Sequence, residues 1–261
     1  MPTLQSLFDL TGRCALITGG TGYLGRALAE ALAEAGASVV IASRSRERAI
    51  EAAKTIPTNS QTHHGVQLDH KDDESLERGF AEATDLTGSL DILVNNGQAG
   101  TADDLTEIDR HGFENHCANA SGYFLLARAL RDDAVSRGKP ASVIMIGSMY
   151  GMVGSYPDAY KDICSASSVG YHTQKGGILQ MTRHLAVYWA NDDVRVNALS
   201  PGPFPPDTVD ARLHERLSAK SPMGRMGKPH ELKGALLLLA SDAGSYITGQ
   251  NLIVDGGWTA W

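Results

Sequence analysis

Two residues of the chain, Tyr171 and Lys175, have the types and the spacing needed for proton transfer. They form the only Tyr-x-x-x-Lys of the sequence. Residues four apart on a helix lie on one face, so the phenol and the ammonium can be neighbours. We expect the ammonium to lower the pKa of the tyrosine toward neutral pH, so that the phenol exchanges a proton with an alcohol or carbonyl oxygen. So short a motif also fits two unrelated surface residues, and its meaning depends on the rest of the chain.

A glycine-rich segment near the N-terminus predicts a dinucleotide site. An apolar run at 13–18 ends in this segment, and a helical pattern follows it. Glycines let the backbone approach a pyrophosphate, and the start of a helix offers free N–H groups and the positive end of its dipole. A plain turn is the alternative. The residues expected to touch the cofactor here are Gly19, Thr21, Gly22, Tyr23, Leu24 and Gly25.

The end of the next strand indicates which cofactor is bound. The apolar run at 37–42 is followed by Ser43 and Arg44. A carboxylate at this point would bind the ribose 2′-hydroxyl of NAD, whereas an arginine can accept the 2′-phosphate of NADP. We therefore expect NADP(H) to be favoured over NAD(H), with Ser43 and Arg44 in contact with it. The alternative is that Arg44 and Arg46 are solvated at the start of a helix.

These segments resemble the short-chain dehydrogenase/reductase family of single-domain proteins, and the resemblance covers nearly all 261 residues. Residues 91–97 resemble the Asn-Asn-Ala-Gly strand end of the family, 196–202 its Pro-Gly turn over the nicotinamide, and 246–257 its C-terminal signature. Asn119 and Ser148 stand where the family has its catalytic asparagine and serine.

The resemblance implies a role for each matched residue. Tyr171 would be the acid or base, Lys175 would lower its pKa and hold the nicotinamide ribose, and Ser148 would hydrogen-bond the substrate oxygen. Asn119 would hold a water that links Lys175 to solvent. A strand-end turn is the alternative for Ser148, a locally satisfied polar group for Asn119, and a cap on the next helix for Asp69. The further cofactor contacts that the resemblance implies are Leu68, Asp69, Asn95, Gly97, Pro201 and Gly202.

The chain departs from the family pattern in both cofactor loops. Gly22 occupies a position where many NADP-binding members carry a basic residue, which weakens the preference for NADP(H) without reversing it. Gln98 ends the segment that is usually Asn-Asn-Ala-Gly, and prolines at 203, 205 and 206 replace a threonine often found after the Pro-Gly turn.

The segment between Ser148 and Tyr171 is unusual as well, because the two residues are 23 apart, more than is common in the family. Tyr160 lies nearer to the usual spacing, but Cys164 follows it where the lysine is required. Because the mechanism requires a lysine four residues later, we expect Tyr171 and not Tyr160 to be the catalytic tyrosine. His172 is expected to be structural, because neighbours on a helix point about 100° apart.

The same segment predicts the substrate class. It is rich in Ser, Tyr and Asp, and it resembles gluconate dehydrogenases and the sugar oxidoreductases of flagellin modification and surface polysaccharides. We expect a small polar substrate: a sugar, a sugar acid or a polyol. A reductase of 3-oxoacyl or other small ketones is the alternative, and a nucleotide-sensing protein without catalysis is a third reading.

Apolar runs and helical patterns alternate along the chain. Strands are expected near 13–18, 37–42, 62–68, 90–95, 141–147, 193–199 and 251–254, and helices near 22–35, 46–55, 73–86, 103–109, 110–137, 169–190, 207–218 and 229–240. The alternation predicts an α/β fold, a Rossmann-type doubly wound parallel sheet of about seven strands in a single domain, residues 1–261. Ligands then bind beyond the carboxyl ends of the strands, where loops near 152–168 and 202–222 are expected to act as lids.

Composition argues against several classes of function. A net charge of −7 and a pI near 5.7 argue against nucleic-acid binding. No apolar run approaches the ~20 residues of a membrane span. The three cysteines form no metal pattern, and without an export signal they indicate a reducing cytoplasm.

Two groups of bulky or titratable side chains are expected away from the chemistry. His63, His64 and His70 show no metal spacing and are expected to be solvated. Trp258 and Trp261 are expected to pack against a neighbouring subunit, because the family resemblance implies a homo-oligomer, a tetramer or a dimer. Packing within the same subunit is the alternative.

Overall fold

A parallel sheet forms the centre of the computed structural model, which describes residues 1–100, 105–206 and 208–261. The strand order is β3-β2-β1-β4-β5-β6-β7, and every neighbouring pair is parallel. This confirms the predicted Rossmann-type, doubly wound sheet. The strands are β1 (Cys14–Thr18), β2 (Ser38–Ser43), β3 (His64–Gln67), β4 (Ile92–Asn95), β5 (Ala141–Ile146), β6 (Val194–Pro201) and β7 (Asn251–Val254).

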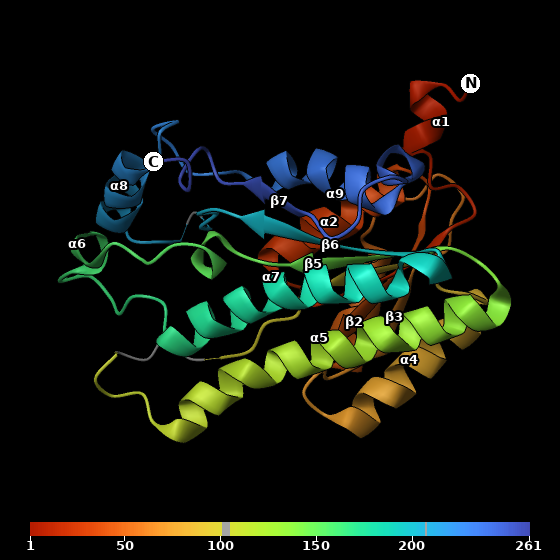
Figure 1. The fold of residues 1–261 in the computed structure, drawn as a ribbon, viewed down its shortest axis with the longest axis horizontal. Coiled ribbons are helices and arrows are strands. Elements are labelled where there is room, and N and C mark those ends of the chain that lie inside the picture. Colours follow the sequence, from red (N-terminus) through yellow and green to blue (C-terminus); the bar gives the residue numbers. More distant parts are fainter. Residues whose placement is uncertain (101–104, 207) are drawn as a thin grey trace.

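Helices cover both faces of the sheet (Figure 1). One layer consists of α4 (Asp73–Thr87), α5 (Arg110–Arg137) and α7 (Val169–Trp189). The other consists of α2 (Tyr23–Glu34), α3 (Arg46–Lys54) and α9 (Lys233–Ala240). The inner strands β1, β2, β4 and β5 can be largely apolar because they are buried on both sides, whereas the edge strands β3 and β7 are only partly buried. Along β1, for example, Leu16 packs toward the first layer, while Ala15 and Ile17 pack toward the second.

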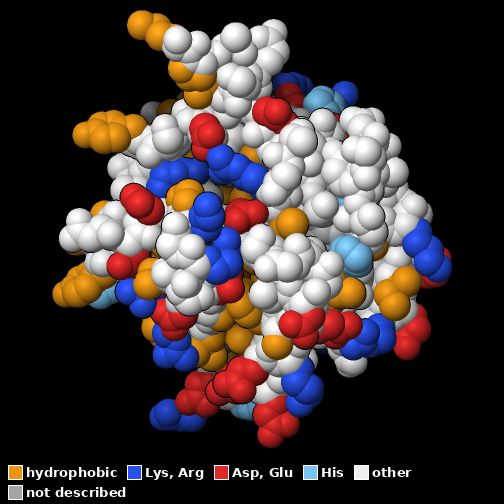
Figure 2. Space-filling model, turned by 90° about the vertical axis from the view of Figure 1, so that its right-hand side faces the viewer, with side chains coloured by type: hydrophobic (Ala, Val, Ile, Leu, Met, Phe, Trp, Pro, Cys, Tyr) orange, Lys and Arg blue, Asp and Glu red, His pale blue; other side chains and the backbone are white. Residues whose placement is uncertain are grey.

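The loops that follow the strands gather at the carboxyl edge of the sheet, on the left of Figure 1, together with the short helix α6 (Pro157–Tyr160) and with α8 (Ala211–Lys220). The opposite edge carries intermixed acidic and basic side chains (Figure 2). Ion pairs there include Arg13 with Asp242 at 2.6 Å and Arg131 with Asp192 at 2.8 Å. The carboxyl edge is therefore the edge that the loops shape into a site.

Several predicted elements differ from the structure. Residues 105–109 form a turn and not a helix, and 103 and 104 lie outside the described residues. The helix expected at 207–218 is α8, which begins at Ala211 because the Asp210 side chain accepts a hydrogen bond from the Arg212 N–H; residue 207 lies outside the described residues. The expected helix at 229–240 divides into a 3₁₀ turn, η3 (Pro229–Leu232), and α9. Short elements that were not predicted are α1 (Leu4–Phe8), α6, η1 (Met149–Gly151), η2 (Ala190–Asp192) and η4 (Asp242–Gly244).

The described residues contain neither a membrane-spanning helix nor a cluster of metal ligands. None of the helices they form has both the length and the apolar character needed to cross a membrane. Within the same ranges, His, Cys, Asp and Glu side chains form no group of three or more that could hold a metal ion.

Candidate active site

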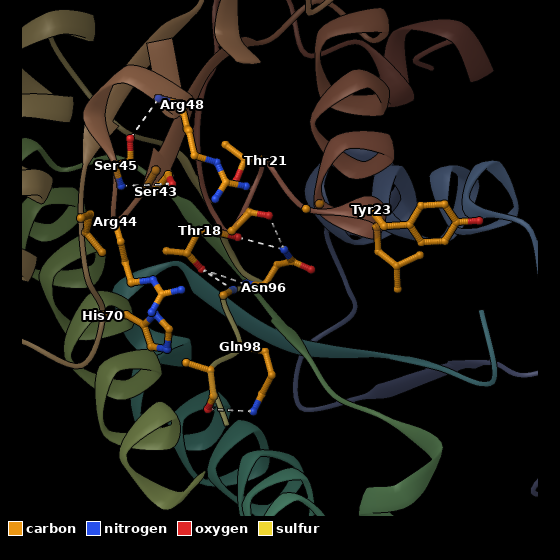
Figure 3. A pocket seen from close by; sticks show the side chains of 18 residues that line it. Thr18, Thr21, Tyr23, Ser43, Arg44, Ser45, Arg48, His70, Asn96 and Gln98 are labelled. Atoms are coloured by element: carbon orange, nitrogen blue, oxygen red, sulfur yellow. Dashed lines mark hydrogen bonds between the residues drawn. The ribbon is translucent and has the colours of Figure 1, made fainter. Parts of the chain in front are cut away.

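The turn between β1 and α2 shapes one wall of a cavity of about 630 Å³ (Figure 3). Gly19 has φ +64°, a conformation that favours glycine. A Cβ atom on Gly25 would come within 2.2 Å of the Gly19 carbonyl oxygen, so the turn closes only with glycine there. The N-cap of α2 is Gly22, which has no side chain to occupy the first N–H groups of the helix. This wall therefore fits the pyrophosphate of a dinucleotide.

Most of the predicted cofactor contacts line this cavity. Those that do so are Gly19, Thr21, Gly22, Tyr23, Leu24, Gly25, Ser43, Arg44, Leu68 and Gly97. Lining residues that were not predicted to contact the cofactor include Ser45, Arg48, His70, Asn96 and Gln98.

Two guanidinium groups, those of Arg44 and Arg48, are directed into the cavity from the end of β2 and the start of α3 (Figure 3). Neither forms an ion pair within residues 1–100, 105–206 and 208–261. Arg46 between them is instead bound by both oxygens of Glu82, at 2.6 and 2.7 Å. Arg48 could have been found from the sequence, because Ser45 is a helix cap and places Arg48 in the first turn facing the site.

The adenine end of the cavity differs from expectation. The Asp69 carboxylate accepts from the Lys71 N–H at 3.0 Å and is not part of the lining, and the cap of α4 is Asp72. His70 lines the cavity, is buried, and bonds through Nε2 to Asn119 Oδ1 at 2.8 Å. The prediction that His70 is solvated is therefore wrong. It is wrong for His63 too, whose Nδ1 accepts from the Val39 N–H at 3.1 Å.

The two asparagines at the end of β4 point in opposite directions. Asn95 is fully buried and donates to the Tyr123 carbonyl at 2.9 Å, so its side chain lies in the α5 layer and does not line the cavity. Asn96 lines it and donates to the carbonyls of Thr18 and Gly19 at 3.0 and 3.1 Å. The alternation of side chains along a strand separates the two neighbours.

A second cavity, of about 210 Å³, holds the catalytic candidates. Its lining includes Ser148, Tyr171, Lys175, Pro201 and Gly202, all at the carboxyl ends of β5 and β6 or on α7. The two cavities share three lining residues, Leu24, Asn96 and Gln98. They are therefore two parts of one cleft, which runs from the arginines to Lys175.

Two serine caps place the catalytic side chains. The Ser148 Oγ accepts from the Tyr150 N–H at 3.1 Å and begins η1 directly after β5. The Ser168 Oγ accepts from the Tyr171 N–H at 3.2 Å and begins α7. Lys175 follows Tyr171 by four residues on that helix, so the two side chains share one face, as predicted.

Burial sets the charges of the two residues. It lowers the pKa of Lys175 to about 7. It also raises the pKa of Tyr171, and the hydrogen bond from Ser148 lowers that pKa by less. The pKa of Tyr171 thus lies above its usual value and not below it as expected, and the effect that opposes burial comes from Ser148 and not from Lys175. At neutral pH the phenol keeps its proton, as a donor to a carbonyl oxygen must.

The ammonium of Lys175 is held between the sheet and two rings. Its Nζ donates to the Ile146 carbonyl at 2.7 Å. It lies 5.6 Å from the ring centroids of both Tyr171 and Tyr123.

Asn119 fixes the loop that follows β4. Its Oδ1 accepts from the Ala99 N–H at 2.9 Å, and its Nδ2 donates to the carbonyls of Ala99 and His116 at 2.8 Å. These bonds match the reading of a polar group satisfied locally. Between Asn119 and Lys175 the described part of the chain shows no direct hydrogen bond.

The loop at 152–168 is firmly attached to the rest of the chain. Lys220 pairs with Asp158 at 2.7 Å, and Trp258 is buried against Tyr156, with ring centroids 5.5 Å apart. Trp258 therefore packs within its own chain and not against a neighbouring subunit, whereas Trp261 is 72% exposed. The His172 ring stacks on the Tyr150 ring, with the two ring centroids 4.6 Å apart, in agreement with its predicted structural role.

The comparisons with known proteins agree with this geometry. A family profile described as enoyl-(acyl carrier protein) reductase matches residues 22–259. Galactitol 2-dehydrogenase (L-tagatose-forming) of Cereibacter sphaeroides is 35% identical, over 98% of this chain and 99% of its own length. The 3-oxoacyl-[acyl-carrier-protein] reductase FabG of Aquifex aeolicus is 33% identical, over 95% and 98%.

A solved structure shows the same fold. It is a gluconate 5-dehydrogenase from Burkholderia cenocepacia J2315 in complex with NADP and tartrate, which is 29% identical, with a TM-score of 0.89 and coverage of 99% of this chain and 100% of that one. The chain belongs to the short-chain dehydrogenase/reductase family, whose members are oxidoreductases that interconvert alcohols and carbonyls.

Proposed function

We propose that the protein is an NADP(H)-dependent dehydrogenase that interconverts a secondary alcohol and a ketone of a polyol, a sugar or a sugar acid. One observation carries the proposal: the cavity with two guanidiniums that pair with no carboxylate of the described residues and the cavity with Tyr171, Ser148 and Lys175 are one cleft. The chain is similar to a galactitol 2-dehydrogenase and a gluconate 5-dehydrogenase, whose names specify a polyol and a sugar acid as substrates. This similarity supports the substrate class.

The residues would divide the chemistry as follows. A bound nicotinamide supplies or accepts the hydride. Tyr171 gives its phenolic proton to the carbonyl oxygen during reduction and takes it back during oxidation. Ser148 donates a hydrogen bond to the same oxygen and stabilises the charge that develops there. Lys175 replaces the proton that Tyr171 has given.

Asn119 is proposed to border the path by which water returns protons to Lys175. Its four-way hydrogen bonding to Ala99, His70 and His116 would keep that wall rigid. For the nicotinamide itself we propose contacts with Gly97, Pro201 and Gly202, which line the cleft around the catalytic set.

The preference for NADP(H) follows from Arg44 and Arg48. An arginine without a carboxylate partner, placed beside hydroxyl groups, is suited to hold a phosphate by charge-assisted hydrogen bonds. Thr21, Ser43 and Ser45 line the same part of the cavity. This supports a 2′-phosphate site formed by two cations and several hydroxyls.

We further propose that the protein forms a single domain and acts in the cytoplasm as a homo-oligomer, a tetramer or a dimer. Val187 and Tyr188 on α7 are 76% and 69% exposed, which provides an apolar surface for such contacts. Light scattering of the purified protein in solution would give the number of subunits, and a monomer at all concentrations would contradict this proposal.

The function is tested with purified protein, NADP⁺ or NAD⁺, and a panel of galactitol, arabinitol and gluconate, followed by the absorbance of the reduced nicotinamide. We expect turnover of at least one of these compounds, lost by roughly a thousandfold in Tyr171→Phe because the proton donor is gone. Tyr246→Phe changes a fully exposed tyrosine outside the cleft; it is the matched control and should keep full activity. Faster turnover of a 3-oxoacyl thioester than of every polyol would favour the alternative that the similarity to the Aquifex aeolicus reductase suggests.

A further inference from the structure

Two phenols meet beside the catalytic tyrosine. The hydroxyl of Tyr150, two residues after Ser148, lies 2.6 Å from the hydroxyl of Tyr160 at the end of α6. Both rings pack in one small cluster with Tyr171, around Trp258. The loop at 152–168 therefore brings Tyr160 close to Tyr171, the tyrosine proposed to transfer the proton.

The direction of this hydrogen bond leaves one donor free. A phenol has a single hydrogen to donate. Tyr150 is buried, and Tyr160 is the one partner of its hydroxyl among the described residues, so Tyr150 meets its need by donating to Tyr160. The hydrogen of Tyr160 then remains available for another acceptor. Burial raises the pKa of both tyrosines, so that both keep their protons.

Contacts with neighbouring residues hold both tyrosines, Tyr150 and Tyr160, in place. Tyr150 stacks on His172, whose Nε2 is 2.8 Å from the Ser167 hydroxyl. Tyr160 ends a helix whose following carbonyl, that of Lys161, accepts from Arg216 at 2.7 Å. A donor fixed before the substrate arrives loses little entropy on binding.

Tyr160 also borders an open cavity. Tyr160 lines a cavity of about 750 Å³, together with the hydroxyls of Ser155, Ser165 and Ser167 and the ring of His172. Tyr160 packs in the same cluster as Tyr171, and the two phenols are close enough to interact electrostatically, so Tyr160 borders both this cavity and the catalytic tyrosine. A substrate that reaches Tyr171 with one carbon can extend its next carbons toward Tyr160.

We propose that the Tyr160 hydroxyl donates a hydrogen bond to a hydroxyl oxygen of the substrate on a carbon beyond the one that reacts. Tyr160 is then a specificity-determining residue that favours polyhydroxylated substrates over simple alcohols. This inference rests on the proposed function, because it takes the substrate to be a polyol or a related sugar.

The test compares two substrates in Tyr160→Phe. For the polyol that the wild-type protein oxidises best, we expect kcat/KM to fall about 10- to 50-fold, mainly through KM, because a buried substrate hydroxyl loses its partner. For sec-butanol, which has no second hydroxyl, we expect a change of less than about twofold. Tyr156→Phe is the matched control on the same loop, and it should leave both values unchanged.

Each other outcome is decisive. Equal losses on the polyol and on sec-butanol would overturn the inference, because Tyr160 would then only support the fold of the site. No loss on the polyol would overturn it as well. A wild-type protein that oxidises sec-butanol but no polyol would refute the proposed function, and the inference with it. The unfolding midpoint of Tyr160→Phe, compared with that of Tyr156→Phe, shows whether the fold is intact.

Discussion

Gln98 and Gln174 hold each other through both of their amide groups. The Gln98 Nε2 donates to the Gln174 Oε1 at 3.0 Å, and the Gln174 Nε2 donates back to the Gln98 Oε1 at 2.9 Å. Gln98 belongs to the loop that lines both parts of the cleft, and Gln174 directly precedes Lys175 on α7. The loop at which the chain departs from the family pattern is thus fastened to the catalytic helix.

We expect this amide pair to couple the cofactor loop to α7. Gln98→Leu and Gln174→Leu should each destabilise the protein, and the double variant should lose less than the sum, with a coupling energy of about 1 to 2 kcal/mol for two neutral hydrogen bonds. Chemical unfolding of the four proteins gives this value. Gln180→Leu, on the exposed side of α7, is the control and should change little. Additive losses would show that the two amides act independently.

The choice of cofactor should depend on Arg48. In Arg48→Ala we expect the Kd of NADPH to rise roughly 10- to 100-fold, because charge-assisted hydrogen bonds to the phosphate are lost. The Kd of NADH should stay within about twofold, since NADH has no 2′-phosphate. Fluorescence titration of the bound nicotinamide measures both constants. Arg46→Ala is the control, because Glu82 holds Arg46 outside the cavity; similar losses in both variants would argue against a phosphate site.

The stability of the protein should rise with pH because of Lys175. Its pKa is lowered from 10.5 to about 7 in the folded state. Above about pH 7 the unfolded chain therefore binds a proton at this lysine that the folded chain does not, and the free energy of unfolding increases with pH. Between about pH 7 and about pH 9 we expect a gain on the order of 1 to 2 kcal/mol relative to Lys175→Met. Urea unfolding at both pH values measures it, and parallel slopes for the two proteins would show that Lys175 does not titrate in this range.

The two C-terminal tryptophans should differ sharply. Trp258 is 1% exposed under the loop at 152–168, whereas Trp261 is 72% exposed. We expect Trp258→Ala to destabilise the protein by about 3 to 5 kcal/mol and to raise KM for the substrate, because the loop at 152–168 loses the side chain on which it packs. Trp261→Ala should stay within about 0.5 kcal/mol. If Trp261 proved the costlier position in dilute solution, contacts between subunits would have to account for it.

Most of the strands could be predicted from the sequence for a physical reason, and with them the edge of the sheet at which the candidate catalytic residues lie. The inner strands β1, β2, β4 and β5 are buried on both sides, so each is a largely apolar run that stands out in the sequence. Several of the helices that follow begin with a cap residue that can be recognised in the sequence. The bounds of α5 were predicted correctly, whereas the separate helix expected at 103–109 was wrong, because residues 105–107 form a turn. The helix expected at 207–218 begins later than predicted because its start depends on a single cap, Asp210.

The details of the site depend on how deeply each side chain is buried and on where it points. The spacing of residues along the sequence does not reveal either property. The pKa of Tyr171 moves upward because the phenol is buried, and no pattern of residue types reports that. Asn95 and Asn96 look alike in sequence, yet only a strand seen in three dimensions shows which of them faces the cleft. His70 lies far from Asn119 along the chain and meets it only through the fold.

The Ser168 cap has a consequence for how this protein can change over time. Because the cap sets the start of α7, Tyr171 is positioned by its helix and not by its distance along the chain from Ser148. The loop between Ser148 and Ser168 can therefore lengthen, shorten or be replaced while Tyr171 and Lys175 keep their positions. New substrate preferences can then arise through changes in this one loop, with the proposed catalytic residues unchanged.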